Sequence, residues 1–542
     1  MRKFAKIFVL ALVCLSALPV TGCKKEVSTV SDGNAPTIQL FTPFDAGTEL
    51  KSDTWVIKKW GEEVGANIEV QSCNSDVFSE KIAAVFAGGN FPDIINYYGD
   101  EKTYDKYGDR LFLDTNKAMK DGKMPNLKSW YDKFPEIKAA MTNISDGGIY
   151  GLPQFREDDF PYSAWTVRED LLKKAGTSSK PIMTIDELKD MMLALKKVSG
   201  QPYVTSSRLG WTYFAEEIGY IFGCAPYMTY DNKWSYSTNT FVYGPTEPAY
   251  KTWVEFMRWM YENQILHPSF ATMTTQELNA GYAEGKFQVC MEQTSMVGNA
   301  LRGNDEKYPG REEAAIIGLN INGEIPKQAT MPHYNIGRRW PATITKSSKN
   351  LDKAIEAMDW LYSEEGNTLV RYGEEGVHWK KDDRFPTGRI SLLNGNYDIA
   401  QKLKKGEITQ EEYDAVPKAA DFGIGSHWLN AIQSKDQMRG NPCSEDPIAL
   451  AAYEFKANTR QAMYDQGIAI EADPLLKFTD EEEKEINDIL IPLETYLSEQ
   501  TTKFIMGSLS MDKWDEFQAQ MKSMGSERLE EIYNNRYNES YK

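Results

Sequence analysis

The sequence is poor in residues that build metal sites and lacks the signatures of common enzymes. Its 542 residues include only 4 His and 6 Cys, and no two Cys have the C-x-x-C spacing. A structural zinc site needs four such ligands, usually at short spacings, so nothing here favours one. The motifs G-x-S-x-G, H-E-x-x-H and G-x-x-x-x-G-K-S/T are absent as well. We therefore expect no metal, no cofactor and no catalytic residues.

The N-terminus carries an apolar run that is too short to cross a membrane. Three basic residues within the first six precede the run from Ile7 to Val20, whereas a spanning helix needs roughly 20 apolar residues. A basic start followed by a short apolar segment is typical of a secretory signal peptide. We predict that residues 1–22 form such a signal and that the protein is exported.

Small residues lead to a Cys at the end of this segment. The sequence Val20-Thr21-Gly22-Cys23 resembles the bacterial lipobox, in which the Cys thiol receives a diacylglycerol. We expect the lipid on Cys23 to hold the mature protein at the outer face of the cell membrane. Residues 24–35 are small and polar, which predicts a flexible tether. An ordinary signal peptide with a chance Cys is the alternative.

Acidic residues outnumber basic ones. The chain has 61 Lys and Arg against 79 Asp and Glu, a net charge of −18. Removal of residues 1–22 takes away three basic residues, so the mature charge is 58 minus 79, or −21. Such a surface repels nucleic acid and anionic lipid headgroups. We expect no nucleic-acid partner, and attachment to the membrane only through the lipid.

The remaining cysteines leave one question open. If Cys14 leaves with the signal peptide and Cys23 is acylated, single Cys remain at positions 73, 224, 290 and 443. One disulfide is compatible with export, and buried free thiols are equally compatible.

Aromatic residues are abundant, with 13 Trp, 29 Tyr and 23 Phe. Many of them belong in a core, because aromatic side chains bury large areas. In an exported acidic protein, Trp and Tyr also suit a site that stacks on the flat C–H faces of sugar rings. Both interpretations stay open at this point.

Hydrophobic periodicity predicts alternating strands and helices at the start of the mature chain. Strands are expected at 37–41, 67–70 and 91–98, with helices at 54–64 and 78–87 between them. This order predicts a mainly parallel α/β sheet, in which ligands bind beyond the carboxyl ends of the strands. Further on, Thr184 and Glu187 form a capping box for a helix over 185–198. Helices are also expected over 351–363 and through most of the last 70 residues.

Short motifs in order along the chain carry a resemblance to a known family. With the lipobox at Cys23, the chain resembles the extracellular solute-binding lipoproteins of bacterial ABC importers (family 1), in particular the large subgroup associated with saccharide uptake. The motifs are Gly89–Ile94, Gly148–Pro153, Trp165–Leu172, Thr184–Leu188, Glu284–Phe287, Trp360–Gly366, Arg371–Gly376, Lys503–Gly507 and Trp514–Phe517.

The resemblance implies a fold and a domain organisation. We expect a two-lobed α/β fold of the type II periplasmic-binding-protein kind, with a ligand cleft between the lobes and a helical C-terminal extension. The chain is expected to cross between lobes near 149–154, 322–329 and 373–377. The expected divisions are 1–22 signal peptide, 23–35 tether, 36–152 plus 325–373 lobe one, 153–324 plus 374–500 lobe two, and 501–542 C-terminal helices.

Candidate ligand-binding residues are aromatic or lie next to a crossover. Trp340 and Trp428 rank first among the stacking candidates, because Pro341 and the Gly423/Gly425 loop put them on irregular backbone. Core packing is the competing interpretation for each Trp, and a cap or a solvated ion pair for each polar residue. The remaining candidates are Trp165, Trp211, Trp379, Asp93, Arg156, Glu157, His333 and Arg338.

These features predict a lipid-anchored, monomeric, non-enzymatic protein. It is expected to capture a saccharide, specifically an oligosaccharide, and to deliver it to the permease subunits of an ABC importer. An exported carbohydrate-active enzyme is one alternative, although adjacent acids such as Glu364/Glu365 point in different directions and do not make a catalytic pair. A lipoprotein that senses or adheres to glycans is the other.

Overall fold

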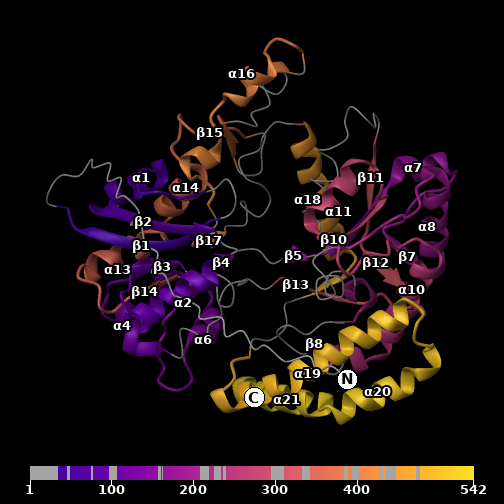
Figure 1. The fold of residues 1–542 in the computed structure, drawn as a ribbon. Coiled ribbons are helices and arrows are strands. Elements are labelled where there is room, and N and C mark those ends of the chain that lie inside the picture. Colours follow the sequence, from indigo (N-terminus) through magenta and orange to yellow (C-terminus); the bar gives the residue numbers. More distant parts are fainter. Residues whose placement is uncertain are drawn as a thin grey trace, which may run out of the picture. The chain divides into compact units, whose positions relative to one another are not determined.

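The computed structural model of the protein describes most of the chain from residue 35 to its end (Figure 1). The described residues are 35–542 without 45–48, 75–76, 97–106, 157–159, 162, 208–218, 225–232, 236–239, 294–310, 332–341, 384–387, 394–401, 404, 427–428, 430, 434–446 and 471–475.

A four-stranded sheet with the order β14-β3-β1-β2 organises the first part of the chain (Figure 1). β1 runs parallel to β2 and β3, while β14 runs antiparallel to β3. The predicted strand and helix order is confirmed, because a helix joins each pair of consecutive parallel strands. The elements are β1 (Thr37–Phe44), α1 (Trp55–Val64), β2 (Asn67–Asn74), α2 (Phe78–Gly88), β3 (Ile94–Asn96) and β14 (Ala342–Ile344).

Helices cover both faces of this sheet. Neighbouring residues of a strand point to opposite faces, and the two faces contact different helices. Phe41 stacks on Phe78 of α2, with ring centroids 5.2 Å apart. Leu40 belongs to a larger cluster with Trp60 of α1 and Ile355 of α13 (Leu351–Trp360), which we call the first core.

The first core is assembled from distant segments. It combines residues 38–155 with 342–370 and with Leu429 and Ile432. The indole Nε1 of Trp60 donates to the carbonyl of Ala357 at 3.0 Å, which ties α1 to α13. The further helices of this region are α4 (Thr115–Lys120), α5 (Pro125–Lys133), α6 (Pro135–Met141) and α14 (Glu364–Tyr372).

The helix predicted over 351–363 is confirmed as α13, but it ends three residues earlier, and a second helix, α14, follows after a turn. α13 ends at Trp360, and the hydroxyl of Ser363 accepts a hydrogen bond from Gly366 N at 3.0 Å, which caps α14. The turn is so tight that a Cβ on Gly366 would lie 2.2 Å from the carbonyl oxygen of Trp360. Hydrophobic periodicity continues through this turn, so the pattern alone does not reveal the helix end.

A second core forms around an antiparallel sheet with the order β10-β6-β11. It combines residues 165–319 with 476–533. The predicted capping box is confirmed, because Thr184 Oγ1 accepts from Glu187 N and Glu187 accepts from Thr184 N. The elements are β6 (Ser163–Arg168), α7 (Glu169–Lys174), β7 (Ile182–Thr184), α8 (Ile185–Ser199), α10 (Pro248–Glu262), α11 (Thr275–Ala283), β10 (Val289–Gln293), β11 (Glu313–Ile316) and β12 (Gly318–Asn320).

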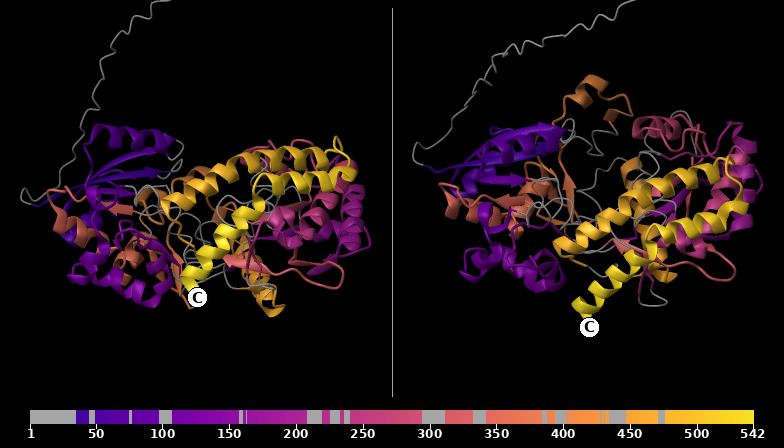
Figure 2. Two further views of the ribbon diagram at one scale, coloured as in Figure 1. Left: turned by 90° about the horizontal axis from the view of Figure 1, so that it is seen from below. Right: turned by 60° about the horizontal axis from the view of Figure 1, so that its bottom comes forward.

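Three C-terminal helices complete the second core, and Figure 2 shows them in yellow beside one another. They are α19 (Asp480–Ile505), α20 (Trp514–Ser523) and α21 (Ser526–Tyr541), as the sequence predicts. The buried hydroxyls of Tyr250 in α10 and Thr501 in α19 lie 2.7 Å apart. Asn534 of α21 pairs with both backbone groups of Phe241, at 2.8 and 2.9 Å, in place of a neighbouring strand.

Short strands, the short helix α16 and the longer helix α18 are the remaining elements of the described chain. No helix within it combines the length and the apolar character needed to cross a membrane. These elements are β4 (Phe155–Arg156), β5 (Phe160–Pro161), β8 (Lys233–Ser235), β9 (Thr240–Val242), β13 (Gln328–Met331), β15 (Trp379–Lys381), β16 (Arg389–Ser391), α16 (Gln410–Asp414), β17 (Ile432–Gln433), α18 (Pro447–Asp465) and β18 (Ala469–Ile470).

Candidate ligand-binding site

The carboxyl ends of three parallel strands share one edge of the N-terminal sheet. β1 ends at Phe44, β2 at Asn74 and β3 at Asn96. Asn96 is 6% exposed, and its Nδ2 donates to the hydroxyl of Thr42 on the neighbouring strand at 3.3 Å. Because ligands of open α/β sheets bind beyond this edge, it is the first part of the candidate site.

The segment after Tyr150 is anchored to the first core up to Phe155. Leu152 N donates to the carbonyl of Ala342 at 2.7 Å, and Phe155 N donates to that of Ala431 at 2.9 Å. β4 pairs in parallel with β17, with Phe155 opposite Ile432 and Arg156 opposite Gln433. The backbone of Arg156 is therefore held beside β17 immediately after the anchored segment.

Aromatic rings enclose Phe155 on several sides. The residue is fully buried, and its ring lies 5.3 to 6.1 Å from four others. The hydroxyl of Tyr362, one of these four, donates to the carbonyl of Pro153 at 2.5 Å. This packing fixes the point at which the expected first crossover leaves the first core. The four rings belong to Trp130, Tyr131, Phe134 and Tyr362.

Strand β13 starts within the expected second crossover and pairs with β5, which follows the expected first crossover. β5 and β13 are antiparallel, with Phe160 opposite Met331 and Pro161 opposite Thr330. β13 also pairs in parallel with β18. The adjoining Ile325 packs in a small cluster with Ala164 and Ile468. Residues 325–331 thus contact elements that follow β4, although they were expected with lobe one.

The segment after α14 packs against α1 through its histidine. His378 is 1% exposed, with its ring 4.3 Å from Trp55 and 4.7 Å from Phe422 between centroids. Its Nδ1 accepts from Glu374 N at 3.1 Å. Burial lowers the pKa of His378 and so favours the neutral imidazole. These contacts join residues 373–379 and 419–425 to the first core. The residues after 373 were expected in lobe two.

Trp379, a predicted stacking residue, is 6% exposed. Its Nε1 donates to the carbonyl of Gly373 at 3.0 Å. The guanidinium of Arg389 covers its ring at 5.0 Å and that of Tyr372 at 4.7 Å. A cation over one face and burial of the remainder favour a packing role for this indole.

Trp165 and Asp93 also have structural surroundings. Trp165 is fully buried in the second core against Phe222 and Phe256. Asp93 is half-buried and accepts from Gln39 N at 2.8 Å, which joins β1 to the beginning of β3. Asp93 therefore lies at the edge of the sheet opposite to the carboxyl ends of the strands. The surroundings of Trp165 agree with the packing interpretation, and those of Asp93 agree with a structural carboxylate.

The other candidates are not described at the level of side chains. Arg156 has its backbone in β4. Cys23, Glu157, Trp211, His333, Arg338, Trp340 and Trp428 lie outside the described residues.

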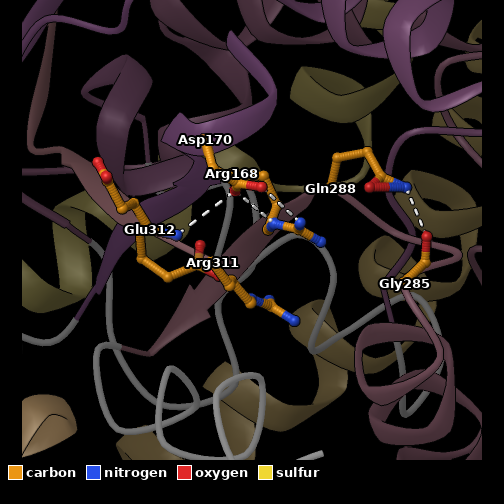
Figure 3. Close-up of polar contacts among 7 residues, drawn as sticks. Arg168, Asp170, Gly285, Gln288, Arg311 and Glu312 are labelled. Atoms are coloured by element: carbon orange, nitrogen blue, oxygen red, sulfur yellow. Dashed lines mark hydrogen bonds and ion pairs between the residues drawn. The ribbon is translucent and has the colours of Figure 1, made fainter. Parts of the chain in front are cut away.

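A buried ion cluster that the sequence did not suggest lies at the end of β6, about 17 Å along the strand from Ser163. Nε and Nη2 of Arg168 each donate to one carboxylate oxygen of Asp170 at 2.8 Å, and Figure 3 shows this pair next to Arg311 and Glu312. Arg311 in turn pairs with Glu313, which stands opposite Arg168 in the sheet. Two Arg-x-acid sequences are the only signal for it, and they are common on solvated surfaces.

Burial dominates the electrostatics of this cluster. The side chains of Arg311 and Glu313 are 7% and 4% exposed. Loss of hydration raises the pKa of Glu313 to about 7, although Arg311 acts in the opposite direction. These nearly inaccessible side chains pair across β6, α7 and β11 and so hold the three elements together. Within the described residues, no group of three or more His, Cys, Asp or Glu is arranged to hold a metal ion.

Comparison with known proteins gives a consistent family. A family model described as bacterial extracellular solute-binding protein matches residues 48–368, more than half of the chain. Lipoprotein LipO of Bacillus subtilis strain 168 is 21% identical over 404 residues, covering 71% of this chain and 77% of LipO. The polygalacturonan/rhamnogalacturonan-binding protein YtcQ of the same strain is 19% identical over 485 residues, covering 88% of this chain and 86% of YtcQ.

Solved structures of the same kind share the fold. An EF-hand mutant of the ABC-transporter substrate-binding protein FusA of Streptococcus pneumoniae, in complex with fructo-nystose, superposes with a TM-score of 0.68 at 17% identity. The match covers 93% of this chain and 99% of FusA. The predicted two-lobed fold is therefore confirmed.

Proposed function

Because the chain belongs to the bacterial extracellular solute-binding proteins, we propose that it captures an oligosaccharide between its two lobes and delivers it to the membrane subunits of an ABC importer. The observation that carries this proposal is the match to YtcQ, named for binding polygalacturonan and rhamnogalacturonan, across 88% of this chain. The complex of FusA with fructo-nystose supports the same ligand class. All of these relatives are named as binding proteins or lipoproteins, which favours capture without catalysis.

The two hydrophobic cores support a division into lobes. In this proposal lobe one comprises residues 36–156 and 342–433, and lobe two comprises residues 160–331 and 447–542. The contacts of β13 and of His378 favour these boundaries over a change of lobe at residues 325 and 374. The C-terminal helices become part of lobe two, because they share its core.

The proposed ligand site combines the carboxyl edge of the N-terminal sheet with the crossover segments. Asn96 and Arg156 mark its described parts. Trp211, Trp340 and Trp428 remain the proposed stacking residues, with Glu157, His333 and Arg338 as polar partners. Trp165 and Trp379 are left out, because their rings are buried.

A lipid on Cys23 would keep the protein near its membrane partner. Two acyl chains contribute on the order of 0.8 kcal/mol per buried methylene, which suffices for stable anchoring. The name of LipO is in line with a lipoprotein. We propose export, removal of residues 1–22 and attachment of a monomer to the outer face of the cell membrane.

A thermal-shift screen with oligosaccharides of differing linkage and uronic acid content tests this function. A binder is expected to raise the unfolding temperature, because a ligand specific to the folded state stabilises it. Chromatography of each saccharide after incubation is the matched control, and an unchanged profile is expected. Release of shorter products would instead support an exported carbohydrate-active enzyme.

A further inference from the structure

A surface pocket of about 340 Å³ lies between the start of α5 and the outer side of α13. Its walls are largely apolar, with Pro125 on one side and Ile355 and Trp360 on the other. Pro125 is exposed and Trp360 half-buried, so both border the opening. The volume is at the lower end of the range for small-molecule pockets and is large enough for one or two side chains.

The pocket is built on a rigid frame. Asp359 of α13 is 5% exposed and accepts from Asn126 N at 3.2 Å and from Leu127 N at 2.9 Å. These are backbone groups at the start of α5 that have no partner within their own helix, so the carboxylate caps α5 from outside. Asn126 Nδ2 adds a third bond at 3.0 Å. The two helices that form the pocket are therefore fixed relative to each other.

The charged side chains around this apolar space are mostly acidic. Asp352, Glu356 and Asp359 contribute three negative charges against one positive charge from Lys123, a sum of −2. Asp352 and Glu356 are 83% and 58% exposed at the rim. The ion pair of Asp352 with Lys123, at 2.7 Å, is solvent-exposed and therefore weak, so a cation from outside can replace Lys123 at little cost. Glu356 pairs at 2.6 Å with Lys353, which is 28% exposed and also donates to the carbonyl of Val64 at 2.9 Å.

We propose that this pocket receives a loop of the importer's membrane subunits that presents an apolar side chain next to a lysine or arginine. The apolar side chain fills the space between Pro125 and the wall formed by Ile355 and Trp360, while the cation meets the rim carboxylates. Complementary charge of this kind selects the partner and speeds its encounter. The inference rests on the proposed function, since it names a surface for the partner that receives the saccharide.

Charge reversal at the rim separates docking from saccharide capture. The variant D352K/E356K changes two exposed side chains, so the fold is expected to persist. The variant D488K/E516K is the matched control, because Asp488 and Glu516 are 64% and 70% exposed and also pair with lysines. Each variant is measured for unfolding temperature, for affinity toward the saccharide found in the screen, and for saccharide uptake by cells with that variant as their only copy.

The expected result is a loss of uptake without a loss of affinity. D352K/E356K is expected to lower uptake by about tenfold, with affinity and unfolding temperature as in the wild type, while D488K/E516K keeps normal uptake. Normal uptake with D352K/E356K would overturn the docking site and leave the proposed function intact. A parallel loss of saccharide affinity would assign the pocket to the saccharide. A wild type that sediments as a dimer, together with a D352K/E356K variant that sediments as a monomer, would assign the pocket to a second copy of the chain. Failure of the wild type to bind any saccharide would instead contradict the proposed function.

Discussion

Replacement of Glu313 by Gln is expected to change how stability depends on pH. The pKa of Glu313 is raised from its ordinary value of 4.5 to about 7, because burial removes its hydration. Between these pH values the folded protein holds a proton that the unfolded chain has released. The free energy of unfolding contributed by this group therefore falls as the pH rises from about 4.5 to 7. The amide introduced by Glu313→Gln has no proton to lose, so this dependence disappears in the variant.

The difference of about 2.5 pKa units corresponds to about 3 kcal/mol, at roughly 1.4 kcal/mol per unit. The interaction of Arg311 with the ionised carboxylate needs no separate term, because its effect is already contained in the pKa of Glu313. The free energy of unfolding of Glu313→Gln minus that of the wild type should therefore rise by about 3 kcal/mol between pH 4.5 and 7.5. Urea unfolding at four pH values measures it, with fluorescence from Trp165 and Trp253 reporting on the second core.

The control is Glu312→Gln, which removes one negative charge from the adjacent position, where the side chain is 55% exposed. The free energy of unfolding of Glu312→Gln minus that of the wild type is expected to stay constant across the same pH range. A flat difference for Glu313→Gln would refute the reasoning, because it would mean that Arg311 keeps Glu313 ionised in the folded protein down to pH 4.5. A difference that falls with pH would refute it more strongly.

Three further predictions follow from the structure and the sequence. Phe155→Ala removes a fully buried ring from its aromatic enclosure and should lower the free energy of unfolding by about 3 to 5 kcal/mol in calorimetry; a loss below about 1 kcal/mol would mean that the segment is not anchored there. Trp340→Ala or Trp428→Ala should weaken saccharide binding by about 1 to 3 kcal/mol in titration calorimetry, by analogy with other stacking contacts, and identical titration curves would remove them from the site. Cys23→Ala should move the protein from the membrane fraction to the medium, and unchanged fractionation with unchanged acylation would contradict the tether.

Local patterns predicted the elements of the fold well. The periodicities of 37–41, 54–64 and 67–70 each correspond to an observed strand or helix, and the Thr184/Glu187 capping box starts α8 where expected. These features depend on residues close in sequence. The end of α13 was placed three residues too late and α14 was not predicted, because the turn between them depends on one hydroxyl cap at Ser363 and on space for Gly366.

The site was much harder to predict from the sequence. Trp165 and Trp379 look like stacking residues, and only their three-dimensional surroundings reveal buried rings. Asp93 stands next to a strand, but its partner Gln39 lies 54 positions away. The pairing of Arg168 with Asp170 beside Arg311 and Glu313 depends on the register between β6 and β11. Long-range register and burial are the properties that a single sequence does not display.

Titration calorimetry with the saccharide that gives the largest thermal shift tests the central claim most directly. We predict saturable binding of one saccharide per chain, with the saccharide recovered intact from the calorimeter cell after the titration. Absence of a heat signal with every oligosaccharide of the panel, or recovery of shortened products, would contradict the claim.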